Sequence, residues 1–259
     1  MHAYPSWVHE FVKSDPAGPT AFAYEVAGLS WLRAAGTAGA RVVTVHTSDD
    51  REIHMEQLRS VAATTDAAAD FGRRLAVTHD AGADAFGAAP PGWEGDGWIG
   101  VEPMPLATEP SWGAFFARHR CRPYLARAQA RGSMTTADAT LIERLLDRLE
   151  AGDFDDDAPP ARIHGDLWSG NLIPTADGYT LIDAAAHGGH RLTDLAMLCL
   201  FGAPRLEAVL DAYAAASTHL PDDWRSLVPL HQLHPLLVHA AIFGGLYGSQ
   251  AASAARRYV

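Results

Sequence analysis

The sequence has few cysteines and no long apolar run, and each absence narrows the class of protein. The two cysteines, Cys121 and Cys199, form no CxxC pair, so we expect no disulfide framework. No segment approaches the roughly 18 consecutive apolar residues of a membrane-spanning helix. The opening residues, "MHAYPSWVHEF", lack the basic and apolar regions of a signal peptide. The sequence therefore predicts a cytoplasmic protein with no membrane partner.

Positive charge is also scarce. The 259 residues carry 31 acidic against 20 basic side chains, which gives a formal net charge of −11. This balance argues against a nucleic-acid partner or an anionic membrane surface. A nucleotide phosphate is not excluded, because one lysine and a divalent metal can outweigh the overall charge locally. The composition is that of an ordinary globular protein, and we expect a monomer.

The first 58 residues predict a small mixed lobe. Residues 7–14 alternate as a strand, and a helix over 20–36 follows, with Thr20 as its N-cap and Gly36 at its end. Residues 41–47 and 51–58 flank a short polar turn and are typical of a hairpin. The order strand, helix, strand, strand therefore defines a first domain over 1–58.

The remaining chain, 59–259, predicts a mostly helical lobe. A long loop rich in glycine and proline interrupts it at 83–110. One β-rich patch lies within it, made of three short apolar pieces, and the chain is helical again from Thr193. The predicted helices are 64–82, 111–132 and 135–152, and the apolar pieces are 162–164, 171–174 and 179–183. The predicted fold class is therefore α+β with two lobes.

The β-rich patch carries the most informative segment, "RIHGDLWSGNLIP" at 162–174. Asp166 and Asn171 lie at the two ends of one loop, and Asp183 ends the strand that folds back beside it. A carboxylate and an amide oxygen suit Mg²⁺, which shares its ligand shell with phosphate. Asp166 would then face an incoming hydroxyl. This is the arrangement of phosphoryl transfer in the protein-kinase class.

The first lobe supplies the partners that such a site requires. Lys13 ends the predicted strand in "FVK", and Glu25 lies in the following helix. A lysine held by a helix glutamate steadies the α- and β-phosphates of ATP. The segment Met55, Glu56 and Gln57 stands where a hinge between the lobes would bind adenine through its backbone groups.

The motifs "HGDLWSGN" and "LIDAAAHGGHRLTDLAM" resemble the fructosamine kinase (ketosamine 3-kinase) family, which is similar in fold to aminoglycoside, choline and protein kinases. The resemblance implies a two-lobed kinase-like fold that uses ATP and Mg²⁺ to phosphorylate a sugar hydroxyl of fructosamines or ribulosamines. It implies that Asp166 is the base, that Asn171 and Asp183 hold the metal, and that Lys13 and Glu25 form the phosphate clamp.

The same resemblance assigns supporting residues. Trp168 would line the sugar site, Asp194 would accept backbone N–H bonds from the catalytic loop, and His164 would brace that loop. We also expect His187 and Arg191, close to the metal aspartate, to contact the substrate, and a structural hydrogen bond is an equal alternative for His187.

One departure concerns the start of the chain. "MHAYPSWVHE" holds no glycine, where the family places two strands and a glycine-rich turn. Either the sequence starts too late to include that hairpin, or the first lobe lacks it. Two alternatives therefore stay open. One is a kinase for another hydroxyl substrate, such as an aminoglycoside or an amino alcohol. The other is a nucleotide-binding pseudokinase.

Overall fold

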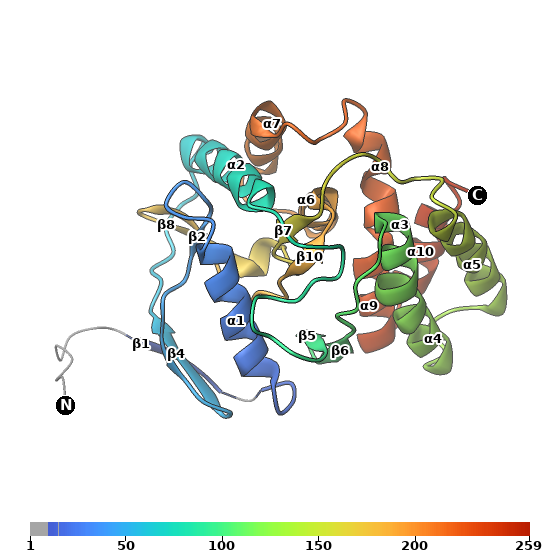
Figure 1. Ribbon diagram of the computed structural model, residues 1–259, viewed down its shortest axis with the longest axis horizontal. Coiled ribbons are helices and arrows are strands. Elements are labelled where there is room, and N and C mark those ends of the chain that lie inside the picture. Colours follow the sequence, from blue (N-terminus) through green and yellow to red (C-terminus); the bar gives the residue numbers. More distant parts are fainter. Residues whose placement is uncertain (1–9, 15) are drawn as a thin grey trace.

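The computed structural model describes residues 10–14 and 16–259, and the smaller of its two regions is built around a three-stranded sheet. The antiparallel strands are ordered β1 (Glu10–Ser14), β4 (Glu52–Glu56) and β3 (Val45–Ser48). Helix α1 (Ala21–Arg33) lies beside this sheet, as Figure 1 shows. Phe22, Leu29 and Ile53 form part of the apolar layer between them. The predicted order of strand, helix, strand, strand is present.

The predicted strand 41–47 is wrong in its extent, because the chain breaks there into two strands that join different sheets. Strand β2 (Arg41–Val42) pairs in parallel with β9 (Gly178–Leu181), which pairs with β8 (Leu172–Thr175). Val43 is buried and its N–H donates to Leu181 C=O at 2.9 Å, which fixes the break. The sheet β2–β9–β8 therefore connects the smaller region to the β8–β9 hairpin, which Asn171 precedes and Asp183 follows.

The larger region is mostly helical and contains two apolar clusters. Helix α2 (Thr65–Asp80) packs on α7 (Leu206–Ala216), and a second group of helices gathers at the far end of the molecule (Figure 1). The other helices are α3 (Trp112–Phe115), α4 (Arg122–Ala130), α5 (Thr136–Glu150), α6 (Arg191–Phe201), α8 (Trp224–His231), α9 (Leu233–Ile242) and α10 (Tyr247–Ala255). A π-helical segment, Phe116–Cys121, joins α3 to α4.

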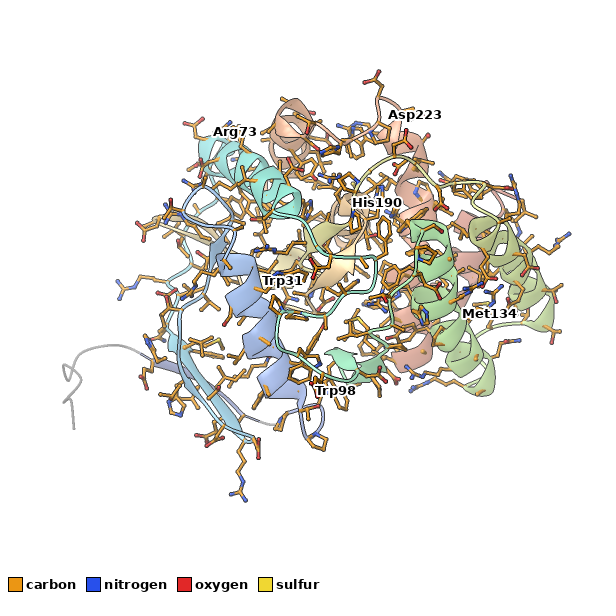
Figure 2. All side chains as sticks on the ribbon, viewed as in Figure 1. Trp31, Arg73, Trp98, Met134, His190 and Asp223 are labelled. Atoms are coloured by element: carbon orange, nitrogen blue, oxygen red, sulfur yellow. The ribbon has the colours of Figure 1, made fainter. Side chains whose placement is uncertain are left out.

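Local sequence signals account for several helix starts. The hydroxyls of Thr64 and Thr135 accept from the backbone N–H groups of Ala67 and Asp138, as N-cap residues do. Thr20 also occupies the N-cap position, but its hydroxyl does not cap α1. It accepts instead from the indole Nε1–H of Trp98 at 3.1 Å, at the end of α1 where Figure 2 labels this tryptophan. The start of α1 is thus tied to the long loop.

The loop over 83–110 is ordered around a small hairpin, β5 (Gly97–Ile99) and β6 (Glu102–Met104). A further antiparallel pair, β7 (Ala161–Ile163) and β10 (His187–Gly189), frames the loop that carries Asp166. None of the helices in the described ranges is long and apolar enough to cross a bilayer.

Candidate active site

One buried carboxylate, that of Asp194, holds the loop between β7 and β8 in place. Asp194, in the first turn of α6, accepts from the backbone N–H of His164 at 2.7 Å and of Gly165 at 3.0 Å. The imidazole of His79 reaches the same carboxylate at 3.1 Å. Burial alone would raise the pKa of Asp194, but the hydrogen bonds, led by that from His79, hold it below its ordinary value. The anion is therefore the form that the fold selects.

His164 is a second support of this loop. Its Nδ1 accepts from the backbone N–H of Asp166 at 3.3 Å, and its Nε2 lies 2.9 Å from Ile182 C=O. Both contacts are satisfied by the neutral tautomer with the proton on Nε2. Burial lowers the pKa of His164, which favours this neutral form. The loop and the strand that leads to Asp183 are thus connected through one imidazole.

Gly165 allows the tight approach of these two segments. Its φ of +81° lies in the left-handed region, and a Cβ at this position would lie 2.2 Å from Ala185 C=O. A side chain at 165 would therefore displace either the loop of Asp166 or the segment that follows Asp183.

Asp166, Asn171 and Asp183 come together at the mouth of the loop. The Asn171 amide donates to both the backbone and the carboxylate oxygen of Asp166 at 2.9 Å, and it lies 3.4 Å from Asp183 C=O. Asp183 itself has a φ of 54°, which is rare for a residue with a side chain and costs about 1–2 kcal/mol. Such strain persists where surrounding contacts impose it, and it is common at functional sites.

Lys13 reaches this group from the other lobe. Its ammonium lies 2.8 Å from Glu25 Oε2 and 3.1 Å from Asp183 Oδ1. Lys13 is the only lysine among the 20 basic side chains of the sequence, so a compact ammonium is used where every other position has arginine. Burial alone would lower the pKa of Lys13, but Glu25 and Asp183 outweigh it and raise that pKa.

Two carboxyls of the site have unusual affinities for protons. Burial, reinforced by the charge of Asp183, raises the pKa of Asp166 to about 7 against the hydrogen bond from Asn171. Burial likewise raises the pKa of Glu25 to about 7 against the attraction of Lys13. Perturbed carboxyls in a cleft are a recognised mark of a functional site.

Two concave spaces meet at Lys13 and Asp183. The first, of about 240 Å³, is bounded by Asp166, Glu25 and Trp98. The second, of about 370 Å³, has apolar walls from Val43, Met55, Ile173 and Ile182, with Glu56, Gln57 and Leu58 along its edge. The site therefore has a polar compartment beside Asp166 and an apolar slot beside the predicted hinge.

The structure adds detail to the predicted hinge. The Met55 side chain is 2% exposed and forms one wall of the apolar slot, whereas Gln57 is exposed. The N–H of Glu56 already donates to Thr44 C=O at 2.9 Å, so this donor is not available to a ligand.

Trp168 projects from the loop with 40% of its surface exposed. Gly170 packs against its ring, because a Cβ there would lie 2.4 Å from the indole. Trp98 is a site residue that our sequence reasoning missed. It lies in the long loop, where its ring packs over Gly18 and its indole N–H donates to Thr20 beside the cleft.

The structure buries the side chains of His187 and Arg191, the two residues that were predicted to contact the substrate beside Trp168. His187 is 2% exposed, and its Nε2 accepts from the Arg120 guanidinium at 3.2 Å. Arg191 is 1% exposed and forms an ion pair with Asp80 at 2.5 Å. Both residues pack beneath the site and do not face either concave space.

The donor set fits a hard divalent cation. Asp183 offers a half-exposed carboxylate, and Asn171 spends its amide N–H groups on Asp166, which leaves its oxygen as an acceptor. The Lys13 ammonium beside Asp183 shows that this position attracts positive charge. Within the described residues no group of three or more His, Cys, Asp or Glu side chains forms a metal site. A bound Mg²⁺ would therefore complete its shell with phosphate oxygens and water.

The arrangement of the elements around these residues is that of a protein-kinase-like fold. A structure described as the "gentamicin-APH(2")-IIa complex" supports this fold, with a TM-score of 0.60 at 14% identity, over 95% of this chain and 84% of that one. The fructosamine kinase family matches residues 8–259, and the chain belongs to that family.

Individual relatives agree with this assignment. A crystal structure described as a "putative fructosamine-3-kinase" from Thermobifida fusca is 45% identical, with a TM-score of 0.86, over 96% of this chain and 84% of that one. A "probable ketoamine kinase" of Synechocystis is 36% identical over 182 residues, 70% of this chain and 58% of that protein. The chain thus spans less than two thirds of the length of this curated relative. The predicted lack of a glycine-rich hairpin concerns residues 1–9, which lie outside the described residues.

Proposed function

We propose that the chain is an ATP-dependent kinase that phosphorylates a sugar hydroxyl of ketosamines, the fructosamines or ribulosamines. The observation that carries the proposal is the meeting of Asp166, Asn171, Asp183 and Lys13 where the polar compartment joins the apolar slot. The membership of the fructosamine kinase family supports the substrate class.

The apolar slot suits the adenine of ATP. Its walls, Val43, Met55, Ile173 and Ile182, would cover the two faces of the base, and the backbone of Met55–Gln57 would meet its edge. Lys13, held by Glu25, would then lie against the phosphates. Asn171 and Asp183 would hold Mg²⁺, which when bound neutralises phosphate charge.

Asp166 is the proposed base. The sugar hydroxyl oxygen would bond to the γ-phosphorus, the bond from that phosphorus to the β–γ bridging oxygen would break, and ADP would leave. Asp166 would orient the hydroxyl and accept its proton. A pKa of about 7 places this carboxyl near the usual operating pH, where a general base is most effective. Positioning and electrostatics would supply most of the rate.

Trp168 offers a flat, partly exposed face for the sugar ring next to Asp166. We propose phosphorylation at the 3-hydroxyl, because a 3-phosphate on a ketosamine is prone to elimination that releases the amine. The reaction would then be a deglycation step, and the chain would act in the cytoplasm as a monomer.

A substrate panel tests the function. Consumption of ATP is measured with fructosyl-lysine, ribulosyl-lysine, an aminoglycoside and choline, with and without Mg²⁺. Turnover of the ketosamines supports the proposal. Turnover of only the aminoglycoside or choline would show that ketosamines are not the substrates. Mg·ATP binding without turnover of any compound would favour the pseudokinase.

The role of Asp166 has its own test. Asp166→Asn should lower kcat by about 10²–10⁴ while leaving Mg·ATP affinity within a few fold. Asp222→Asn, an exposed acid in the loop before α8, makes the same chemical change outside the site and should leave kcat unaffected. Full activity of Asp166→Asn would show that this carboxyl is not the base.

The single lysine allows a direct test of the nucleotide position. An amine-reactive acylating reagent can modify one side chain in this sequence, Lys13, besides the terminal amine. Mass spectrometry should find that Mg·ATP protects Lys13 from the reagent. Equal labelling of Lys13 with and without Mg·ATP would contradict its contact with the phosphates.

A further inference from the structure

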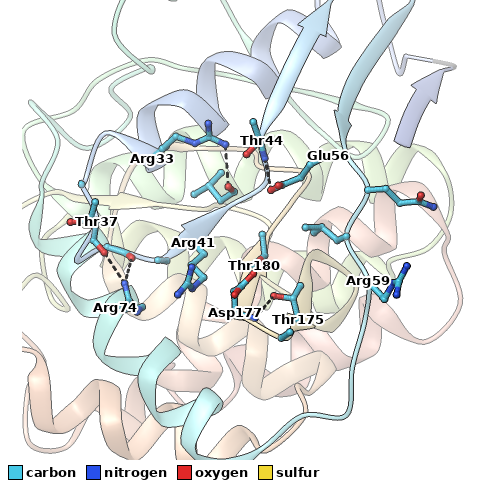
Figure 3. A pocket seen from close by; sticks show the side chains of 17 residues that line it. Arg33, Thr37, Arg41, Thr44, Glu56, Arg59, Arg74, Thr175, Asp177 and Thr180 are labelled. Atoms are coloured by element: carbon cyan, nitrogen blue, oxygen red, sulfur yellow. Dashed lines mark hydrogen bonds between the residues drawn. The ribbon is translucent and has the colours of Figure 1, made fainter. Parts of the chain in front are cut away.

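A third concave space lies on the far side of the hinge from the apolar slot. It measures about 840 Å³, is open to solvent, and is bordered by the α1–β2 connection, β2, the hinge and the β8–β9 turn, as Figure 3 shows. Neither Asp166 nor Lys13 contributes to its walls. A volume of this size is within the range of small-molecule sites. We call it the rear pocket.

The rear pocket is positively charged in a chain of net charge −11. Four arginines line it against two carboxylates, Glu56 and Asp177. Figure 3 shows these arginines around the opening, coming from four separate elements. They are Arg33, Arg41, Arg59 and Arg74. A concave surface of one charge sign concentrates ligands of the opposite sign.

Two of the four guanidiniums are held by the backbone. Arg33 donates to Val42 C=O at 3.1 Å, and Arg74 donates to Thr37 C=O at 2.8 Å. Arg74 also forms an ion pair with Asp70. These contacts fix the α1–β2 connection and set the shape of one wall.

The positive charges of Arg41 and Arg59 are available to a ligand. Among the described residues no carboxylate lies within salt-bridge distance of Arg41 or Arg59. Arg41 extends from β2 over Gly178, where a Cβ would lie 3.3 Å from its Nε, and Arg59 stands on the opposite wall. Guanidinium groups bind phosphate through two parallel hydrogen bonds. The hydroxyls of Thr37 and Thr44 on the same walls are further hydrogen-bonding groups for a sugar or phosphate.

We propose that the rear pocket is a second, non-catalytic site for a small phosphorylated ligand, either a sugar phosphate or a nucleotide. Arg41 binds the phosphate, and the ligand lies against the hinge and extends toward Arg59. The pocket shares Glu56, Gln57 and Leu58 with the apolar slot. Its occupant is therefore positioned to change the affinity of the slot for its own ligand, and the slot's ligand must affect the rear pocket equally.

Calorimetric titrations of the whole chain test the site with three probes, inorganic phosphate, glucose 6-phosphate and AMP. The variant Arg41→Gln with Arg59→Gln removes two charges from the pocket. The control, Arg51→Gln with Arg144→Gln, removes two exposed charges elsewhere. Lys13→Met tests whether a probe binds in the cleft instead.

We expect at least one probe to bind about tenfold more weakly to the pocket variant, which is about 1.4 kcal/mol, and normally to the control and to Lys13→Met. The probe that binds best distinguishes a sugar phosphate from a nucleotide. If the probe bound equally weakly to the pocket variant and to the control, the loss of affinity would come from the change in net charge and not from the pocket. That result, or the absence of binding to wild type at millimolar concentration, would overturn the proposal.

A second titration tests the coupling, which rests on the proposed nucleotide site. The affinity for a non-hydrolysable Mg·ATP analogue should change by about fivefold when the rear pocket is saturated, within the usual range of coupling between sites. An analogue that binds with unchanged affinity would refute the coupling. An analogue that does not bind at all would count against the proposed function instead, and the first titration would still decide on the rear pocket.

Discussion

The buried carboxylate of Asp194 gives the most direct test of how the candidate catalytic loop is held. Asp194→Asn keeps the shape of the side chain but replaces one acceptor oxygen by an N–H₂ group. In the native protein Oδ2 accepts from His164 N–H and lies near His79, and Oδ1 accepts from Gly165 N–H. Whichever way the new amide turns, at least one backbone donor of the loop faces another donor.

The size of the effect follows from these contacts. A hydrogen bond to a charged group contributes about 1.5–3 kcal/mol, and a buried donor without an acceptor costs about 1–3 kcal/mol. Removing the charge gives little relief, because the lowered pKa of Asp194 shows that the fold already favours the anion. We expect Asp194→Asn to reduce the free energy of unfolding by about 2–4 kcal/mol, out of about 5–15 in a typical domain.

Urea unfolding monitored by tryptophan fluorescence measures this loss. The midpoint should fall while the m-value stays constant, since the change lies in the native state. Asp222→Asn, an exposed acid, should leave the midpoint unchanged. A loss below about 1 kcal/mol in Asp194→Asn would refute the idea that this carboxylate holds the loop.

Three further predictions follow from the packing and the titrations. Gly72→Ala should destabilise the protein by about 2 kcal/mol or more, although alanine favours helices, because its Cβ would lie 2.2 Å from Val209 C=O in α7. Stabilisation of Gly72→Ala in urea would contradict that contact. His234 has a pKa lowered to about 3 by burial, so wild type should lose stability as the pH falls below about 6.5, where the unfolded imidazole takes up a proton. His234→Gln should lose about 1.4 kcal/mol less per pH unit between about pH 6 and 4, and parallel curves would exclude this origin. Trp168→Ala should raise KM for a ketosamine about tenfold with little effect on Mg·ATP affinity, and an unchanged KM would remove Trp168 from the sugar site.

Sequence patterns predicted much of the fold, because it depends on local signals. The helix over 136–150 follows Thr135, whose hydroxyl caps its first turn, and the predicted helix 135–152 agrees with it within two residues. The break in the predicted strand 41–47 was not foreseen, because both halves are apolar and extended. Pairing of Arg41–Val42 with a strand more than 130 residues later decides it, and such a partner leaves no mark within the segment itself.

The candidate site shows the same division. Asp166, Asn171 and Asp183 lie within 18 residues of one another, and a hairpin between Asn171 and Asp183 is enough to bring them together. Lys13 was predicted from its position in a strand before the helix that contains Glu25. A stronger indication is that Lys13 is the only lysine of the sequence. His187 and Arg191 lie equally close to the motif, yet the structure buries both. Proximity along the chain does not reveal which way a side chain points.

The sequence by itself determined the family and the chemical types gathered near Asp166, because oxygen ligands, a base and a lysine must be encoded as particular side chains. Only the tertiary structure decided which of them meet. It joined Lys13 to Asp183 across the lobes and brought Trp98 to the cleft. It also raised the pKa of Asp166 by burial. Distances and desolvation depend on every element packed around a group, so they exist only in the folded chain.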